Sequence, residues 1–285
     1  MKRIMTIQDI SCVGKCSLTV ALPVISAAGI ETSVLPTAVL STHTAFPSFT
    51  FKDLTHEIEP IGDTLKSLNI DFDALYTGYL GSVEQVKYVE EFIDKFKKED
   101  TFVLVDPAMA DNGKMYSGFT EDFADHMARL CGKADLIVPN LTEASLMLHI
   151  PYREKYDEEY IKEVLIKLTR LGAKSAAISG VSFNDKEIGF YLYDSITKEF
   201  SYYFNEKLPV LYHGTGDVFA SSSLAAYMNG LNLHASLSLA TDFTLEAMKY
   251  TLKDKNSRFY GVNFEEALPF LIEKINFFKK DLTNQ

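Results

Sequence analysis

Apolar, strand-like runs alternate with amphipathic helical patterns along most of this chain. Six runs have the length and composition of buried strands: 3–10, 32–40, 73–80, 101–109, 135–140 and 174–181. Three segments between them, 83–99, 120–133 and 157–172, repeat apolar residues at i, i+3 and i+4, which is the spacing of an amphipathic helix. Several runs are apolar continuously, as strands covered on both faces are. The alternation therefore predicts an α/β fold around a mostly parallel sheet.

The last third of the chain departs from this alternation. Two aromatic-rich runs flank "DSITKE" within 187–208, which predicts an antiparallel hairpin at one edge of the sheet. The helical patterns 214–230, 233–254 and 263–278 follow the hairpin. Because no linker, repeat or low-complexity tract interrupts the chain, residues 1–285 are expected to form a single domain.

A proline lies inside one further helical pattern, which spans 17–29. Beyond the first turn of a helix, proline removes a backbone hydrogen bond and clashes with the preceding turn. We therefore expect the regular part of this helix to begin at about Leu22, next to Pro23.

The charge balance narrows the possible function classes. The formal net charge is −11, and Lys and Arg cluster only in short pieces such as "DKFKKED", so a nucleic-acid partner is not expected.

No apolar run approaches the ~18 residues of a membrane-spanning helix, and no signal-peptide pattern follows the start of the chain. The three cysteines lack CxxC spacing, so neither a disulfide framework nor a structural zinc site is expected. These features are typical of a cytoplasmic globular protein.

The stretch "YHGTGDVFASS" places two glycines and an aspartate at the start of a small-residue helical run. Glycines at a helix start let the backbone approach a ligand, and the free N–H groups there attract anions. Two interpretations of Asp217 stay open on this pattern alone. The carboxylate favours the helix N-terminus, or it takes a proton from an attacking hydroxyl while Gly214, Thr215 and Gly216 hold a phosphoryl group. A P-loop and a dinucleotide fingerprint are excluded, because their glycine spacings are absent.

Polar residues follow two other strands. Asp106 and Asp111 lie in "DPAMADNG", and Asn140 and Glu143 lie in "PNLTEA". Each motif alone is explained by a turn or a helix cap. Since ligands of open α/β sheets bind at the carboxyl ends of the strands, both motifs and "GTGD" are expected to share one sheet edge. Together they predict a site for Mg²⁺, bound directly or through water.

Two stretches at the ends of other strands offer groups for a flat ring. "DISCVGK" and "LSTHTAF" supply Ser11, His43 and Thr44, a histidine among hydroxyls. Tyr79 in "YTGYLG" could stack on a ring, although an aromatic residue there is otherwise a core residue.

These stretches, in this order from about Met5 to Gly230, resemble the ribokinase-like superfamily and, within it, the pyridoxal kinase family. "GTGD" is the superfamily's loop, and "STHT" with "TGY" points to vitamin B6. The resemblance implies a three-layer α/β/α fold with an antiparallel edge hairpin, ATP as co-substrate, Mg²⁺, and a homodimer. It leaves open a monovalent cation.

The resemblance also implies roles for individual residues. Asp217 would be the general base on the 5′-hydroxymethyl group of pyridoxal, pyridoxine or pyridoxamine, beside an anion hole of Gly214, Thr215 and Gly216. The ring would be held by Ser11, His43, Thr44 and Tyr79, with Phe219 packed nearby. The ATP and metal side would be lined by Asp106, Asp111, Asn140, Glu143 and Ser179, with the metal at Asp111 and Glu143.

Two positions depart from the family pattern. Val138 stands where some relatives carry a cation-binding threonine, which affects the metal arrangement, and "LSTHTAF" differs from the animal pattern beside His43. A hydroxymethylpyrimidine kinase is the nearest alternative, although such enzymes usually place cysteine where Asp217 stands. A sugar kinase would need more polar side chains around the ring stretches. A non-catalytic relative that binds vitamin B6 is the third alternative, and the intact "GTGD" argues against it.

Overall fold

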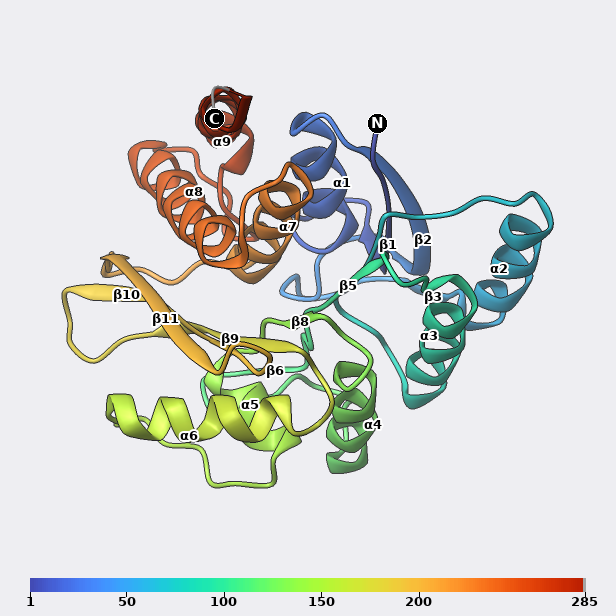
Figure 1. Cartoon of the computed structure of the whole chain (residues 1–285), viewed down its shortest axis with the longest axis horizontal. Helices are drawn as coiled ribbons and strands as arrows, with labels where there is room; N and C mark the ends of the chain where they lie inside the picture. The colour runs from blue at the N-terminus through green and yellow to red at the C-terminus, as the bar shows by residue number, and fades with distance from the viewer. Residues whose placement is uncertain (284–285) are drawn as a thin grey trace.

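A computed structural model describes residues 1–283 as three layers, in which one nine-stranded sheet lies between two layers of helices (Figure 1). The strand order is β11-β10-β9-β8-β5-β4-β1-β2-β3. The strands are β1 (Arg3–Ser11), β2 (Glu31–Leu40), β3 (Phe51–Asp53), β4 (Ala74–Thr77), β5 (Phe102–Val105), β8 (Leu136–Ile137), β9 (Ser175–Val181), β10 (Glu187–Asp194) and β11 (Glu199–Glu206). A separate two-stranded ribbon pairs β6 (Ala110–Asp111) with β7 (Lys114–Met115). The six strands from β9 to β2 are parallel, so the predicted mostly parallel sheet is confirmed.

Helices cover both faces of the sheet. One face carries α2 (Ile58–Ser67), which follows the short 3-10 helix η1 (Thr55–Glu57), then α3 (Val83–Phe96), α4 (Glu121–Cys131), α5 (Leu141–Met147) and α6 (Glu158–Thr169). The other face carries α1 (Leu18–Ala27), α7 (Thr215–Met228), α8 (Leu233–Lys253) and α9 (Phe264–Thr283). Each helical layer closes its own apolar core against the sheet, which explains why the central strands are apolar on both faces.

Both edges of the sheet are antiparallel. The hairpin β10–β11 pairs Glu187 with Glu206 through to Asp194 with Glu199, as the sequence predicts. At the opposite edge β3 pairs antiparallel with β2, which the sequence reasoning missed. The three residues of β3 are all exposed, so they carry no apolar alternation that could reveal a strand.

The expected start of the first helix is wrong. Helix α1 begins at Leu18, four residues before the predicted position, and Pro23 lies inside it. Leu18 is buried, and Val20 and Ala21 are buried against the layer that includes α7. Burial of these residues offsets the hydrogen bond that Pro23 cannot make, so the helix continues through the proline.

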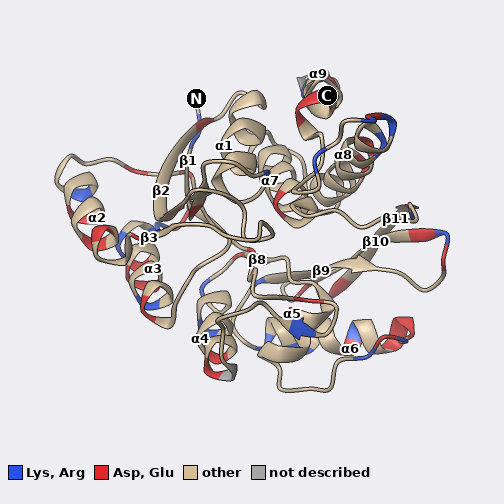
Figure 2. Cartoon of the chain, turned by 180° about the vertical axis from the view of Figure 1, so that it is seen from behind, with Lys and Arg blue, Asp and Glu red and all other residues tan. Residues whose placement is uncertain are grey.

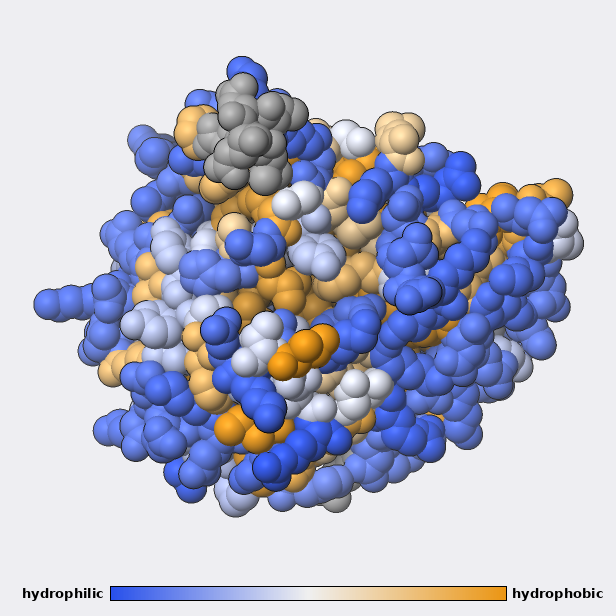
Figure 3. Space-filling view, in the orientation of Figure 1, coloured by the Kyte–Doolittle hydropathy of each residue, from blue (hydrophilic) through white to orange (hydrophobic). Residues whose placement is uncertain are grey.

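Charged and apolar residues are distributed as in a globular domain. Lys and Arg are interspersed with Asp and Glu along the outer helices (Figure 2). In the space-filling view most of the rim is hydrophilic, and apolar surface gathers toward the middle of the face (Figure 3). Within residues 1–283, no helix combines the length and apolar character required to cross a membrane.

Candidate active site

Neighbouring parallel strands bring the predicted motifs together at the carboxyl ends of the strands, which is called the site edge below. Strands β1, β4, β5 and β8 are adjacent and point the same way, so the segments after them are neighbours in space. The Asp106 amide, just past β5, donates to the Thr77 carbonyl at the end of β4 at 2.9 Å. Asn140, past β8, forms a parallel bridge with Ser179 of β9. Helix α7, which belongs to the layer of α1, α8 and α9, begins at these same strand ends.

The loop before α7 has a backbone that only glycine fits. Gly214 is the N-cap residue and has a φ of 77°, in the left-handed region. A Cβ at Gly214 would lie 2.0 Å from the Lys15 carbonyl oxygen, so the loop is packed directly against residues 15–16. Gly216 is exposed, and a Cβ there would meet no atom within 4 Å. Thr215 donates its hydroxyl to the Tyr212 carbonyl at 3.4 Å. Gly216 therefore leaves open space beside the start of α7, where the free N–H groups of a helix N-terminus favour an anion.

Asp217 lies in the first turn of α7 and is partly exposed. Burial, and then the charge of Asp9, raise the pKa of Asp217 from 3.8 to about 7, while the Ser17 main-chain N–H lowers it. A carboxyl with a pKa near neutrality accepts a proton readily and is still ionised in a useful fraction of molecules.

Two further carboxyl groups lie behind this loop. Asp106 and Glu143 are both buried, at 7% and 3% exposure. Burial raises the pKa of both groups well above the ordinary range, followed by the charge of Asp217 for Asp106 and by the charge of Asp106 for Glu143. The edge therefore holds a cluster of like charges that a cation would stabilise.

Asn140 and Glu143 form a capping box at the start of α5. The Glu143 amide donates to Asn140 Oδ1 at 3.0 Å, and the Asn140 amide donates to Glu143 Oε2 at 2.8 Å. Both side chains also hold the segment after β5: Asn140 Nδ2 donates to the Ala110 carbonyl at 2.7 Å, and the Met109 amide donates to Glu143 Oε1 at 3.1 Å. The two residues thus fix the position of the aspartate-bearing loop, and Ser179 lies beside them.

Asp111 is exposed on the small ribbon, where its Oδ1 accepts the Asn112 amide at 2.8 Å. Burial raises the pKa of the Tyr116 hydroxyl, followed by the charges of Glu143, Asp111, Asp106 and Asp217. The four negative charges thus act on the Tyr116 hydroxyl in the same direction.

The donor set fits one mode of Mg²⁺ binding and not another. Within residues 1–283, no group of three or more His, Cys, Asp or Glu side chains is close enough to form a metal cage. Mg²⁺ usually keeps several waters and binds one or two carboxylates together with substrate phosphates. Buried, like-charged carboxylates beside an open anion loop suit that second mode.

At the ends of β1 and β2, Ser11 and His43 flank Gly14. A Cβ on Gly14 would lie 3.2 Å from the Cβ atoms of both residues. The Ala45 amide donates to His43 Nδ1 at 2.9 Å, which leaves the proton of the neutral ring on Nε2. Burial, and then the proximity of His213, lower the pKa of His43, and the two rings lie 5.1 Å apart. His43 is thus a neutral N–H donor next to the loop that precedes α7.

Tyr79 and Asp9 face the same region. Burial, and then the charge of Asp9, raise the pKa of Tyr79 to about 12. Asp9 is 4% exposed, and burial raises its pKa to about 6, while a hydrogen bond with the Ser17 side chain lowers it. Thr44 is exposed on the loop after His43. Phe219 is a residue of the core on the α7 side and contacts Phe190 of β10, with 6.4 Å between ring centroids.

Sequence reasoning missed several residues of this edge, among them Asp9, Ser17, Tyr116 and His213. Asp9 carried a usable signal, because it is the only acidic residue in the strand β1. The others carried none, because a serine before a helix, a tyrosine in a turn and a histidine in a loop are ordinary surface residues.

Comparisons with known proteins agree with this geometry. The family model described as phosphomethylpyrimidine kinase matches residues 29–260. A candidate phosphomethylpyrimidine kinase of Bacteroides thetaiotaomicron VPI-5482, solved in an orthorhombic form with pyridoxal, is 37% identical, with a TM-score of 0.91 and 95% of each chain covered.

Two relatives are named as pyridoxal kinases. The crystal structure of the Lactobacillus plantarum enzyme is 28% identical, with a TM-score of 0.89, and covers 96% of this chain and 98% of that one. The pyridoxal kinase of Dictyostelium discoideum is 25% identical over 236 residues, which are 77% of this chain and 76% of the relative. The expected three-layer ribokinase-like fold is confirmed by the solved structures from Bacteroides thetaiotaomicron and Lactobacillus plantarum.

Proposed function

This chain belongs to the phosphomethylpyrimidine kinase family, and we propose that it transfers the γ-phosphoryl group of ATP to the 5′-hydroxymethyl group of pyridoxal, pyridoxine or pyridoxamine. The observation that carries the proposal is Asp217, a carboxyl with a pKa of about 7 in the first turn of α7, directly after the open loop Gly214–Gly216. The relatives named as pyridoxal kinases support the choice of acceptor.

In this mechanism Asp217 is the general base. Its ionised carboxylate takes the proton of the 5′-hydroxyl as that oxygen bonds to the γ-phosphorus, and the bond from phosphorus to the β–γ bridging oxygen breaks, releasing ADP. A base whose pKa lies near neutrality combines a sufficient ionised fraction with a useful proton affinity.

The amides of Gly214, Thr215 and Gly216 hold the transferred phosphoryl group. They belong to the N-terminal end of α7, where the N–H groups have no partner in the helix and the helix dipole favours negative charge. Donors fixed in place before the reaction stabilise the charge that develops on the phosphoryl oxygens.

Mg²⁺ would be held on the nucleotide side, by Asp106 with Asp111 and Glu143, through waters and phosphate oxygens. When bound, the ion neutralises phosphate charge and orients the γ-phosphoryl group. Asn140 and Ser179 line the same side, where Asn140 fixes the loop that carries the aspartates. A monovalent cation is a further possibility on this side, although Val138 offers it no oxygen ligand from its side chain.

The acceptor ring would lie between Ser11, His43 and Tyr79. The Nε2–H of His43 donates to an oxygen or nitrogen at the edge of the ring, the Ser11 hydroxyl donates or accepts, and Tyr79 offers a flat face. Thr44 closes the outer side. Phe219 supports the base from the core beneath α7, two residues along the helix.

A panel of acceptors with ATP and Mg²⁺ tests the proposal. We expect kcat/KM for a vitamin B6 form to exceed that for hydroxymethylpyrimidine and ribose at least ~10²-fold, because a site built to hydrogen-bond a ring substituent rejects analogues that lack it. Equal or better turnover of the pyrimidine would favour a hydroxymethylpyrimidine kinase. Binding without turnover of any acceptor would favour a non-catalytic relative.

Three further properties are part of the proposal. We propose one catalytic domain over residues 1–285, because a single sheet receives strands from both halves of the chain. A cytoplasmic homodimer is proposed from the family resemblance. Light scattering tests the dimer, and a monomer at micromolar concentration would contradict it.

A further inference from the structure

Lys15 lies at the contact between the acceptor side and the anion loop. Its carbonyl oxygen would be 2.0 Å from a Cβ at Gly214, and its own Cβ would be 2.4 Å from a Cβ at Gly261. Two glycines that are distant in sequence thus enclose the backbone and the side chain of one lysine. A shift of Lys15 in either direction would displace the loop at Gly214.

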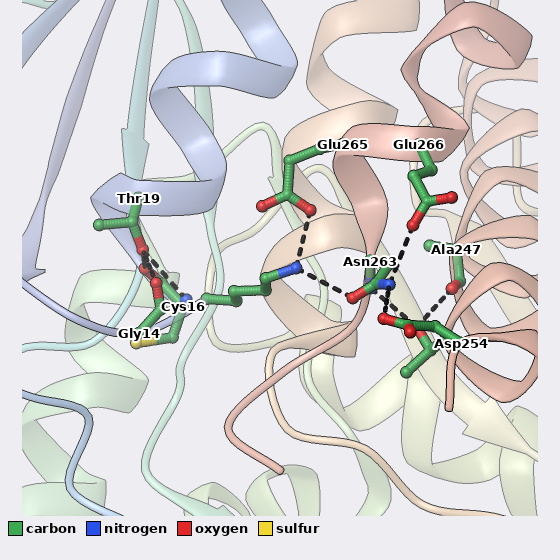
Figure 4. Close-up of polar contacts among 10 residues, drawn as sticks. Gly14, Cys16, Thr19, Ala247, Asp254, Asn263, Glu265 and Glu266 are labelled. Carbon is green, nitrogen blue, oxygen red and sulfur yellow. Dashed lines mark hydrogen bonds and ion pairs between the residues drawn. The ribbon is translucent and has the colours of Figure 1, made fainter. Parts of the chain in front are cut away.

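The Lys15 side chain is anchored at the start of α9, on Asn263 just before the helix and on Glu265 in its first turn, both labelled in Figure 4. Its Nζ donates to Asn263 Oδ1 at 3.1 Å and to Glu265 Oε2 at 2.8 Å. Asn263 is itself held by Asp254 and Glu266, to which its Nδ2 donates at 3.0 Å in each case. The anchor is therefore a network in the C-terminal helical layer and not a single ion pair.

The turn that carries Lys15 is held on its other side as well. The Thr19 hydroxyl, which has a single proton to donate, lies 3.0 Å from the Gly14 carbonyl oxygen and 2.7 Å from the Cys16 carbonyl oxygen. Ser17 has a φ of 49° and a ψ of −129°, a conformation that favours glycine. Strained backbone of this kind persists where the surroundings fix it and is frequent at functional sites. Here the Ser17 amide lowers the pKa of Asp217 and the Ser17 hydroxyl lowers that of Asp9, so the turn lies close to both carboxyl groups.

We propose that Lys15 is a positioning residue, whose side chain, anchored on Asn263 and Glu265, holds the 14–19 turn against Gly214 and so sets the orientation of Asp217 in the phosphoryl transfer. The inference rests on the proposed function. It assigns a role in catalysis to the C-terminal segment 254–266, which contributes no residue to the site described above. Misplacement of a reacting group by about 1 Å can cost on the order of 10²-fold in rate.

A purely structural role for the same contacts predicts a different result. The Lys15 side chain is 16% exposed and that of Glu265 is 51% exposed. Ion pairs with an exposed partner are usually weak, because water and salt screen them. A structural pair would therefore change stability slightly and leave the turnover of folded enzyme unchanged. The positioning role predicts a loss of kcat with little loss of stability.

The main experiment compares Lys15→Met with Lys15→Arg in the full chain. We expect Lys15→Met to lower kcat about 10-fold, with the KM values for acceptor and ATP within about 2-fold of the wild type, because the base is displaced while both binding sites persist. Lys15→Arg keeps two donors and is expected to recover most of the lost kcat. The matched control is Lys95→Met, which breaks the exposed ion pair of Lys95 with Asp63 on the opposite layer and should leave kcat unchanged.

The anchor is tested by Asn263→Ala alone and combined with Lys15→Met. We expect the single variant to lower kcat in the same direction and the double variant to be no slower than Lys15→Met, because both changes break one network. Fully additive losses, or a kcat of Lys15→Met equal to that of the wild type, would overturn the inference.

A readout that needs no turnover separates this inference from the proposed function. Amide hydrogen exchange in 212–218 should be faster in Lys15→Met than in the wild type, with exchange in 83–96 unchanged. If no vitamin B6 form is phosphorylated by the wild type, the proposed function fails, and unchanged exchange in 212–218 would still overturn the positioning role on its own.

Discussion

Buried and half-buried carboxylates lie at both ends of the parallel sheet, and the two ends treat them differently. At the amino ends, Asp135 Oδ2 accepts the Val103 amide at 2.8 Å, and its carboxylate pairs with Lys174 at 2.6 Å and Lys97 at 3.8 Å. Each acidic oxygen there faces a donor or a positive charge. Such an arrangement compensates the cost of removing the carboxylate from water.

At the carboxyl ends, the acidic groups face one another. Burial, followed by the charge of another carboxylate, raises the pKa values of Asp106, Glu143 and Asp217. The amino ends thus pair the acidic group with lysines, whereas at the carboxyl ends the amide hydrogen bonds of Glu143 do not offset burial and neighbouring like charge, which is a cost in stability. That cost is typical of a functional site that binds a cation, a phosphate or a proton.

The largest effect is expected from Asp217→Asn, which removes one of the carboxylates at the carboxyl ends of the strands. We expect phosphorylation to fall roughly 10²–10⁴-fold, the usual contribution of a positioned base, while acceptor binding by calorimetry persists. Near-normal turnover would remove Asp217 from the mechanism.

The same variant tests the stability cost. Because folding raises the pKa of Asp217 from 3.8 to about 7, its contribution favours the folded state below pH 3.8 and is lost as the pH rises through 7. The gain in melting temperature from Asp217→Asn should therefore be larger at pH 8 than at pH 5. An equal gain at both pH values would show that the wild-type carboxyl is not perturbed.

Removal of divalent metal is the next largest effect. Excess chelator should reduce turnover at least ~10²-fold, because the carboxylates of this edge would otherwise face ATP without a neutralising cation. Addition of Mg²⁺ in excess of the chelator serves as the control. Full activity in the chelator would contradict a metal requirement.

The counterpart at the amino ends is Asp135→Asn. We expect it to reduce the free energy of unfolding by about 1 kcal/mol, since Lys174 and Lys97 lose the carboxylate that they share but are themselves 55% and 32% exposed and so partly screened. Denaturant titration measures this loss, and kcat of the folded fraction should not change. A fall in kcat with unchanged stability would reverse the assignment of the two ends.

The smallest effect is expected from Asp9→Asn. The charge of Asp9 raises the pKa of Asp217, so its removal should move the acidic limb of the kcat/KM profile, expected near pH 7 in the wild type, to lower pH. Profiles of both enzymes between pH 5 and pH 9 measure the shift. A limb that stays in place or moves upward would place Asp9 away from the base.

Much of the fold followed from local patterns, and its exceptions have identifiable causes. The apolar runs around Ile7, Leu104 and Ile178 are strands because continuous apolar residues can be buried only between two layers. The start of α1 was misplaced because the preference of Pro23 is local, whereas the packing of Val20 and Ala21 against the α7 layer is not. Strand β3 was missed because its exposed residues carry no pattern.

The candidate site shows the same division between what local sequence patterns predict and what distant contacts decide. Sequence by itself determined that Asp106, Asn140 and Asp217 come after strands or open a helix, and parallel strands necessarily gather such residues at one edge. Only the tertiary structure decided that Asp9 lies beside Asp217 and that Lys15 reaches Asn263, contacts that join residues more than two hundred positions apart. The pKa values were decided there too, because burial and neighbouring charge depend on the whole fold and on no local pattern.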